Sequence, residues 1–558
     1  MTFSQEPPRL VNQYDDDVLL REYLARVVPE PVRRDIEGEL RELGELAAGE
    51  LDALCRAARR DQPELVSYDA WGERADEIRV PEAWRRLARV AAERGLVAIA
   101  YERRHGPWSR VHQFALAHLF APSSHVYTCP LAMTDGAARA LELHRPPDIY
   151  ERAFPRLTSR DPAQSWSSGQ WMTERRGGSD VGLTETVARR DAGGFRLYGT
   201  KWFTSATTSE MALTLARPEG NPPGGKGLAL FFVELRDARG ALNGIAIRRL
   251  KDKLGTRMLP TAELELTGTR AEPVAGLSDG VRAIAPMLQI TRTWNAVCSV
   301  ASMRRGLALA RDYARHRVAF GAPLAEKPLH VATLAQLSAE YEAAFLLSFR
   351  AIELLGRVES GEATPGDTSL ARVLQPIVKL FTAKHAVAHA SEVLELFGGQ
   401  GYVEDTGLPL LLRDAQVLTI WEGTTNVLSL DLLRALSTEA GREALEAELE
   451  RLARVSLPSA LLDARAVALA QAQRALSWHA ATAADRDALE AQARRFAWVL
   501  GRSLSLLLLA EHAAWLAARS GVGRALHAVR RLALTPWDAP SAEHTAAHAL
   551  EIAFPVER

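Results

Sequence analysis

One β-rich stretch, at about residues 168–275, interrupts a chain whose other segments repeat their apolar residues at helical spacing. Within this stretch, the apolar run 228–233 follows an Asn-Pro-Pro-Gly-Gly turn sequence, which is typical of a strand. Before it, helical spacing places Leu87, Val90 and Ala91 on one face of a predicted helix. This order of segments predicts a mainly α protein with an inserted β domain.

Helical periodicity returns after the β-rich stretch, with long apolar-faced runs at 283–316, 329–357 and 370–397 that suit a helical bundle. The region from about 440 to 558 is again helical, is rich in Ala, Leu and Arg, and contains no Lys. At 558 residues the chain is too long for one core. We predict an N-terminal helical domain, a middle β domain, a helical bundle domain and an additional C-terminal helical domain, at 1–165, 166–276, 277–438 and 439–558.

The composition favours a soluble globular protein without a general affinity for polyanions. Hydrophobic residues make up 47% and charged residues 25% of the chain, and the net charge is −1. Three widely spaced cysteines without zinc-ligand spacing favour a reducing compartment and predict no metal site. The polar N-terminus and the short apolar run 504–509 predict neither a secretory signal nor a membrane span, so we expect a cytoplasmic protein.

Two glycine-containing loops carry the residue types of a binding or catalytic site. The first reads Met-Thr-Glu-Arg-Arg-Gly-Gly-Ser-Asp over 172–180, and the second reads Trp-Glu-Gly-Thr-Thr-Asn over 421–426. Consecutive glycines let backbone N–H groups converge on an anion such as a pyrophosphate. Taken alone, the segment 177–180 is also common turn chemistry, and a loop glutamate such as Glu422 is more often simply exposed.

Taken together, the two loops resemble the paired signatures of the FAD-dependent acyl-CoA dehydrogenase family. In that family the first loop cradles FAD and the second carries the base that removes an α-proton. The segment Gly199-Thr-Lys-Trp-Phe-Thr204 resembles the family's G-x-K-x-(W)-I-T strand, in which aromatic residues pack on the isoalloxazine and a threonine hydroxyl reaches its N5 atom. A Trp-Phe pair on a strand is also common in protein cores.

Two later segments extend the resemblance. Arg317-Val-Ala-Phe-Gly321 resembles the family's R-x-x-F-G, whose arginine reaches the FAD pyrophosphate of a neighbouring subunit, and it implies a homodimer or homotetramer. The segment Leu-Phe-Gly-Gly-Gln-Gly-Tyr at 396–402 resembles a glycine-rich turn that approaches the adenosine side of FAD. A plain helix C-cap would explain Gly398 and Gly399 equally well.

The resemblance also implies a fold and a set of site residues. The fold is an N-terminal helical domain, a middle β-barrel and a helical bundle, here with an extra helical C-terminal domain. Glu422 is the implied catalytic base, because the family's alternative position, just before Arg292, holds Thr291. Implied FAD contacts are Met172, Thr173, Gly178, Ser179, Trp202, Phe203, Thr204, Arg317, Gly398, Gly399, Thr424 and Asn426, and implied substrate contacts are Arg292 and Gly423.

Some positions differ from the usual sequence of the family, and these differences point to one of its branches. Gln289 stands where an acidic residue is usual, and Lys327-Pro328 replace a His/Gln-Gln pair. With the segment Arg-Leu-Lys-Asp-Lys-Leu-Gly at 249–255 and the long terminal extensions, they resemble the AidB-like branch, which is associated with the adaptive response to alkylation.

The expected function is an FAD-dependent acyl-CoA dehydrogenase of fatty acid metabolism, in which Glu422 takes the α-proton, flavin N5 accepts the β-hydride and an electron-transfer acceptor reoxidises the flavin. One alternative is an AidB-type DNA-alkylation-response flavoprotein with DNA binding and weak dehydrogenase activity, and another is a lipid-binding protein that sequesters acyl-CoA. Residues 441–558 hold 14 Arg against 13 Asp plus Glu, which is feeble for phosphate binding unless the arginines cluster. Arginines that could cluster are Arg494, Arg495, Arg524, Arg530 and Arg531, although a solvated helix face is the simpler interpretation.

Overall fold

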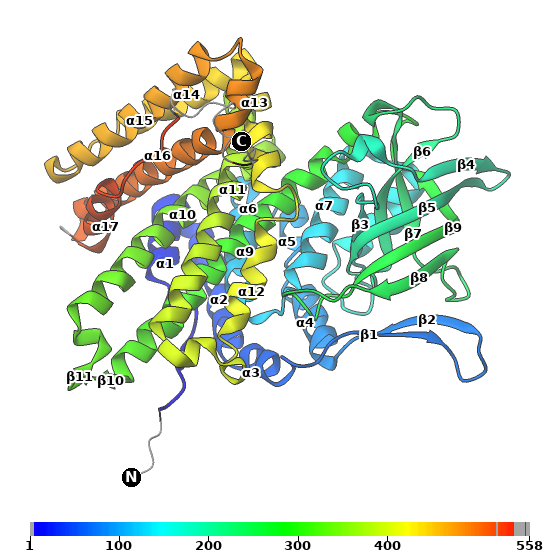
Figure 1. The fold of residues 1–558 in the computed structure, drawn as a ribbon, viewed down its shortest axis with the longest axis horizontal. Coiled ribbons are helices and arrows are strands. Elements are labelled where there is room, and N and C mark those ends of the chain that lie inside the picture. The colour runs from blue at the N-terminus through cyan, green and yellow to red at the C-terminus, as the bar shows by residue number, and fades with distance from the viewer. Residues whose placement is uncertain (1–4, 521–522, 541–552, 554–558) are drawn as a thin grey trace, which may run out of the picture. The chain divides into compact units, whose positions relative to one another are not determined.

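The computed structural model describes residues 5–520, 523–540 and 553, and it shows a mainly helical chain with one β domain, as predicted (Figure 1). Contacts within the chain define two compact units, which are described separately below. The helical unit comprises 1–41, 105–111 and 295–558, and the mixed unit comprises 42–104 and 112–294.

Seven strands of the mixed unit form one sheet that closes into a barrel. The ring runs through β4, β5, β9, β7 and β6, and it closes because β6 pairs with both β7 and β4. The interior is apolar and includes Leu197, Phe231 and Leu264. The predicted β-barrel is therefore confirmed. The strands are β3 (Ser168–Trp171), β4 (Val187–Asp191), β5 (Gly194–Ser205), β6 (Met211–Pro218), β7 (Ala229–Glu234), β8 (Ile245–Leu250) and β9 (Thr261–Pro273).

A β-hairpin precedes the barrel in the chain, in a region where the sequence indicated only helices. Its strands are β1 (Glu64–Tyr68) and β2 (Arg74–Arg79). Leu65 and Ile78 pack against the barrel core. The buried Asp76 accepts a 2.9 Å hydrogen bond from the backbone N–H of Ile247 in β8. The hairpin thus depends on tertiary contacts with the barrel, which local periodicity does not reveal.

The helices of the mixed unit meet around one buried carboxylate. Asp135 of α7 accepts hydrogen bonds from the Nε1 of Trp294 at 2.8 Å, from Gln113 at 2.9 Å and from Tyr101 at 2.8 Å. In α4, Leu87, Val90 and Ala91 are all buried, as the helical spacing predicted. The helices are α3 (Glu50–Ala57), α4 (Glu82–Glu93), α5 (Ala98–Glu102), the part of α6 (Ser109–Phe120) from His112 on, α7 (Thr128–His144), α8 (Pro147–Leu157) and the part of α9 (Gly280–His316) up to Trp294.

Long helices build the helical unit, and the predicted runs at 283–316, 329–357 and 370–397 correspond to α9, α10 and α11. A capping box between Thr364 and Asp367 starts α11. The helices are α1 (Val18–Val27), α2 (Glu30–Ala48), which continues into the mixed unit, α9 from Asn295 on, α10 (Pro328–Ser360), α11 (Pro365–Leu396), α12 (Pro409–Leu418) and α13 (Thr425–Leu436).

The last four helices pack directly on this bundle. They are α14 (Glu439–Ala453), α15 (Leu462–Ala481), α16 (Arg486–Ser520) and α17 (Arg524–Ala533). The long helix α16, orange-red in Figure 1, packs against α10, α11 and α13. In length and composition, Arg486–Arg519 is the one helix among the described residues that could cross a membrane, yet 72% of its apolar window is buried within the protein.

Ion pairs fasten these C-terminal helices to the bundle. Arg524 of α17 pairs with Glu342 of α10 and with Glu22 of α1. Arg350 of α10 pairs with Glu448 of α14 at 3.0 Å. The packing and the ion pairs together make the C-terminal helices an integral part of the helical unit.

Candidate functional site

The first glycine-containing loop is a tight turn on the mixed unit. Glu174 and Gly177 exchange backbone hydrogen bonds of 3.2 and 3.0 Å, so the backbone does adopt a turn. Gly178 lies against Thr173, and a Cβ atom at this position would come within 2.5 Å of the threonine Oγ1. Gly178 and Ser179 are exposed. A larger residue at position 178 would therefore require the Thr173 side chain to move, and the exposed turn is open to a ligand.

A buried ion pair joins this loop to strand β5. The Nζ of Lys201 lies 2.8 Å from Glu174 Oε1, and both side chains are buried. Glu174 also accepts hydrogen bonds from Thr186 Oγ1 at 2.6 Å and from the backbone N–H of Glu185 at 2.6 Å. Burial alone would raise the pKa of Glu174, but Lys201 and these donors outweigh it and lower that pKa. The Glu and Lys of the two motifs are thus structural partners.

A β-bulge follows Lys201 and reorients the aromatic pair. Lys201 pairs with Leu264 and Thr204 with Ala262, so β5 has one more residue than β9 between these two pairings. Bulges redirect side chains in this way. Within the bulge, the Phe203 side chain is 57% exposed.

Two cationic side chains lie close to the two aromatic rings. The Lys251 Nζ lies 3.6 Å from the ring centroid of Trp202 and 4.7 Å from that of Phe203, and the Arg175 guanidinium lies 5.6 Å from Trp202. The backbone N–H of Trp202 donates to the carbonyl oxygen of Thr173, which links this part of β5 to the glycine-containing loop. An exposed aromatic surface with flanking cations and accessible loop N–H groups fits a planar, anionic cofactor such as FAD.

The two hydroxyl groups at the end of β5 have different environments. Thr204 is 1% exposed, and its hydroxyl donates a 2.8 Å hydrogen bond to the carbonyl oxygen of Ala262. Ser205 is half-buried, and its Oγ lies 3.1 Å from Thr261 Oγ1. Because alternate residues of a strand share a face, Ser205 lies on the same side as Phe203, and Thr204 does not.

The predicted base lies in a strained loop of the helical unit. Glu422 has φ 56° and Gly423 has φ 104°, both in the left-handed region. For a residue other than glycine this costs on the order of 1–3 kcal/mol, and such strain is concentrated at functional sites. Glu422 is half-buried. The backbone conformation therefore marks this residue out among the loop glutamates.

Three contacts hold this loop in place. Before it, Asn295 Nδ2 donates a 3.3 Å hydrogen bond to the carbonyl oxygen of Leu418. After the strained pair, Lys379 Nζ donates a 2.7 Å hydrogen bond to the carbonyl oxygen of Gly423. Thr424 is the N-cap of α13, and its side chain accepts a hydrogen bond from the N–H of Val427. Asn426, in the first turn of α13, is exposed.

The remaining predicted FAD contacts of the helical unit lie at the hairpin after α9 and at the end of α11. Half-buried Arg317 precedes the hairpin β10 (Val318–Ala319) and β11 (Ala322–Pro323), whose turn residue Phe320 is 97% exposed. Gly398 follows α11 with φ 58°, as a helix C-cap requires, and Gly399 is exposed. Large exposed apolar side chains of this kind are typical of protein interfaces.

The alternative base position holds no carboxylate. Thr291 lies in the part of α9 that belongs to the mixed unit, and its hydroxyl donates to the carbonyl oxygens of Met287 at 3.1 Å and Leu288 at 3.2 Å. The next residue, Arg292, is half-buried.

The predicted site residues thus divide into two sets. Those of the mixed unit are Met172, Thr173, Gly178, Ser179, Trp202, Phe203, Thr204 and Arg292, and those of the helical unit are Arg317, Gly398, Gly399, Glu422, Gly423, Thr424 and Asn426. No role was predicted from the sequence for Lys201, Ser205 or Lys379. The sequence did contain a signal for Lys201. A buried lysine needs a carboxylate partner, and Glu174 in the neighbouring motif was a carboxylate to which no role had been assigned.

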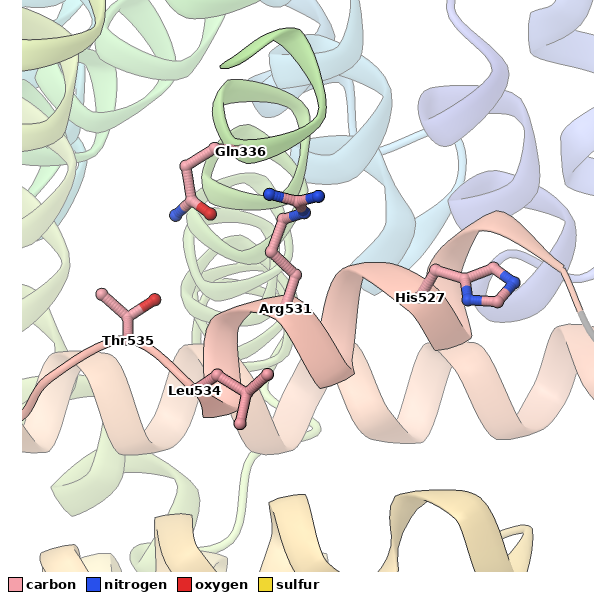
Figure 2. A pocket seen from close by; sticks show the side chains of 5 residues that line it. All are labelled: Gln336, His527, Arg531, Leu534 and Thr535. Atoms are coloured by element: carbon pink, nitrogen blue, oxygen red, sulfur yellow. The ribbon is translucent and has the colours of Figure 1, made fainter. Parts of the chain in front are cut away.

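A groove of about 500 Å³ lies elsewhere on the helical unit, between α10 and α17. Figure 2 shows Arg531 extending from α17 toward α10, near Gln336. None of the predicted site residues lines this groove, whose residues are Gln336, His527, Arg531, Leu534 and Thr535.

Known protein families match most of the chain. The adaptive response protein AidB N-terminal domain matches 5–162, the acyl-CoA dehydrogenase middle domain matches 169–269, and the acyl-CoA dehydrogenase C-terminal domain matches 278–437. The boundaries of the four domains, at 1–165, 166–276, 277–438 and 439–558, remain a prediction from the sequence.

Individual relatives agree with these matches. Acyl-CoA dehydrogenase family member 11 of Caenorhabditis elegans is 46% identical over 445 residues, which cover 78% of this chain and 72% of the relative. The putative acyl-CoA dehydrogenase AidB of Escherichia coli (strain K12) is 34% identical over 71% of this chain and 73% of the relative. The crystal structure of C. elegans ACDH-11 in complex with C11-CoA has a TM-score of 0.95 and 40% identity, and covers 99% of this chain and 97% of that chain. The chain therefore belongs to the acyl-CoA dehydrogenase family of flavin-dependent oxidoreductases and, within it, to the predicted AidB-like branch.

Proposed function

We propose that this protein is an FAD-dependent acyl-CoA dehydrogenase in which Glu422 removes the α-proton of the thioester. The observation that carries this proposal is the backbone of Glu422, which is held in a left-handed conformation by a loop anchored to α9, α11 and α13. A general base must be fixed close to the proton it takes, and anchoring to helices supplies that rigidity. Thr291 leaves no competing carboxylate at the family's other base position.

The residues of the mixed unit would hold the cofactor. When bound, FAD supplies a two-electron acceptor for the hydride that leaves the β-carbon. Trp202 and Phe203 offer aromatic faces for the isoalloxazine, and the loop N–H groups at Gly178 and Ser179 suit the pyrophosphate. Ser205, on the side of Phe203, is the better placed hydroxyl for the flavin edge, because the Thr204 hydroxyl is bonded to Ala262.

The proposed substrate is an acyl-CoA thioester. The related ACDH-11 structure contains C11-CoA, and this chain is similar to it over almost its whole length. Arg292 and Gly423 are the proposed substrate contacts. Glu422 takes the α-proton and becomes a neutral carboxylic acid, while a hydride leaves the β-carbon, so the thioester becomes α,β-unsaturated. We place this reaction in fatty acid metabolism in the cytoplasm, with an electron-transfer protein as the acceptor.

Anaerobic titration of the FAD-loaded protein with acyl-CoAs of graded chain length tests the assignment. Bleaching of the oxidised flavin band is expected for at least one chain length. Glu422→Gln should slow this bleaching by about 10² to 10⁴, or roughly 3 to 5.5 kcal/mol of barrier, with flavin content unchanged. Glu395→Gln, at an exposed position of α11, is the matched control and should behave as wild type. Equal rates in the wild type and Glu422→Gln would assign the base elsewhere.

We further propose a homodimer or homotetramer, in which Arg317 reaches the cofactor of a neighbouring subunit. The exposed Phe320 beside it supports an interface at this hairpin. Arg317→Ala should lose flavin and weaken the oligomer together, as measured by absorbance and by light scattering. Loss of flavin from a protein that stays fully oligomeric would contradict the shared role.

The arginines of the C-terminal helices give little support to the alternative function, DNA binding. Arg524 is engaged by Glu342 and Glu22, and Arg495 pairs with Asp538 at 2.9 Å. Arg494, Arg530 and Arg531 are exposed. We therefore expect weak DNA binding that falls steeply with salt. Tight binding at physiological salt would favour the DNA-alkylation-response function instead.

The other alternative, sequestration of acyl-CoA, makes a different prediction. Acyl-CoA would then bind without bleaching the flavin at any chain length. The combination of measurable acyl-CoA binding with no flavin reduction would establish this function in place of dehydrogenation.

A further inference from the structure

Lys379 is a buried lysine that contacts the loop of the proposed base. It lies near the middle of α11 with 1% of its surface exposed, between the buried residues Val378 and Leu380. Its Nζ donates a 2.7 Å hydrogen bond to the carbonyl oxygen of Gly423. Placing a lysine amine in the interior is costly unless it is well bonded. Its contact with the residue that follows Glu422 therefore requires an explanation.

The backbone conformation of Glu422 and Gly423 explains why a strong hydrogen-bond donor is useful beside them. Glu422 and Gly423 both have positive φ, and a left-handed conformation of a residue other than glycine persists only where surrounding contacts fix it. The Gly423 carbonyl belongs to the peptide that joins the strained pair to Thr424, the N-cap of α13. Fixing this carbonyl sets the rotation of that peptide, and without the donor the peptide could rotate and let Glu422 relax.

We propose that Lys379 is a positioning residue, which holds the Glu422–Gly423 backbone in the conformation that presents the Glu422 carboxylate to the substrate. This inference rests on the proposed function of Glu422 and deepens it. Lys379 acts through the peptide backbone and exchanges no proton with the substrate. Displacing a catalytic group by about 1 Å can cost about 10² in rate, so the effect of losing this bond should be measurable.

The first test compares Lys379→Met and Lys379→Arg in anaerobic stopped-flow reduction of the flavin by acyl-CoA. Lys379→Met should lower the limiting rate about 10²-fold while the half-saturating acyl-CoA concentration and the flavin content change little. Lys379→Arg keeps a donor for the Gly423 carbonyl and should recover part of the rate. Lys384→Met, which changes the next lysine along α11, is the matched control and should reduce at the wild-type rate.

The second test asks whether Lys379 acts through Glu422. In the Glu422→Gln background, Lys379→Met should slow reduction less than about three-fold further, because residues that act as a unit are not additive. A full additional 10²-fold loss, or wild-type reduction by Lys379→Met alone, would overturn the proposal.

Hydrogen exchange separates this inference from the proposed function. The backbone amides of 419–426 should exchange at least ten-fold faster in Lys379→Met than in wild type, in protein without substrate. Unchanged exchange would refute the positioning role whatever the activity. If exchange accelerates but no acyl-CoA reduces wild-type flavin, the dehydrogenase assignment fails while the anchoring of the loop by Lys379 stands.

Discussion

Replacing Lys201 with methionine should loosen the cofactor loop by removing one half of a buried ion pair. The Lys201 side chain is 0% and the Glu174 side chain 4% exposed, and their charged atoms lie 2.8 Å apart. Methionine fills a similar volume, so the main loss is electrostatic. Glu174 would keep its hydrogen bonds from Thr186 and Glu185 but would lose its countercharge.

The magnitude follows from this burial. Breaking a buried ion pair by removing one partner typically costs about 3–5 kcal/mol, because an uncompensated charge stays inside. With 1.36 kcal/mol for each factor of ten, local opening would become about 10² to 10⁴ times more frequent. Because this chain has two compact units, a single global unfolding free energy is a poor measure, and local opening is the better quantity.

Hydrogen exchange of the amides of Gly177, Thr186 and Trp202 is the assay. Gly177 and Trp202 lie in the loop and in β5, and the Thr186 N–H donates to Glu174. Lys226→Met, at an exposed lysine of the same unit, is the control and should leave this exchange unchanged. Adding Glu174→Gln to Lys201→Met should slow exchange again, since glutamine removes the orphaned charge and can still accept hydrogen bonds. Wild-type exchange in Lys201→Met, or faster exchange in the double variant, would refute the reasoning.

Three further predictions concern other contacts. The pKa of Glu174 is lowered in the folded protein. The stabilising contribution of Glu174 should therefore be complete above the ordinary carboxyl pKa of about 4.5 and be lost as the pH falls through the pKa of the folded protein. Thermal denaturation of wild type and Glu174→Gln between pH 3 and 7 would show this loss. Ser205→Ala should weaken FAD binding or shift the flavin spectrum, whereas Thr204→Val should lower the thermal stability of the barrel with the spectrum unchanged. Arg524→Met should accelerate proteolysis at α17 near pH 7, and the effect should shrink at low pH, because burial raises the pKa of Glu342 and protonation would remove its unpaired charge.

Long helices and apolar strands were readable from the sequence because each buries its own periodic face. The runs that became α9, α10 and α11 were predicted almost to their ends. The hairpin β1–β2 was not, because Leu65 and Ile78 gain their burial from the barrel and not from neighbours in sequence. Local pattern is a weak guide where packing partners come from another part of the chain.

The candidate site likewise combines features that the sequence indicates with features that only the tertiary structure shows. The resemblance of the two loops to the family's signatures implied Glu422 as the base, but its positive φ and the contact with Lys379 depend on helices far away in sequence. The role of Thr204 was implied by the resemblance of residues 199–204 to the family's strand, and the structure shows a bulge within that segment. One extra residue reverses which side chains face outward, and periodicity alone does not indicate where a bulge lies.

The burial of α16 has a consequence for how such a chain can evolve. A helix whose apolar surface is covered by α10, α11 and α13 cannot be gained or lost as a separate module, because its removal would uncover matching apolar faces on three other helices. We therefore expect relatives that lack this helix to carry more polar residues on those faces. A shortened ancestor would need polar substitutions on α10 and α11 before it could stay soluble.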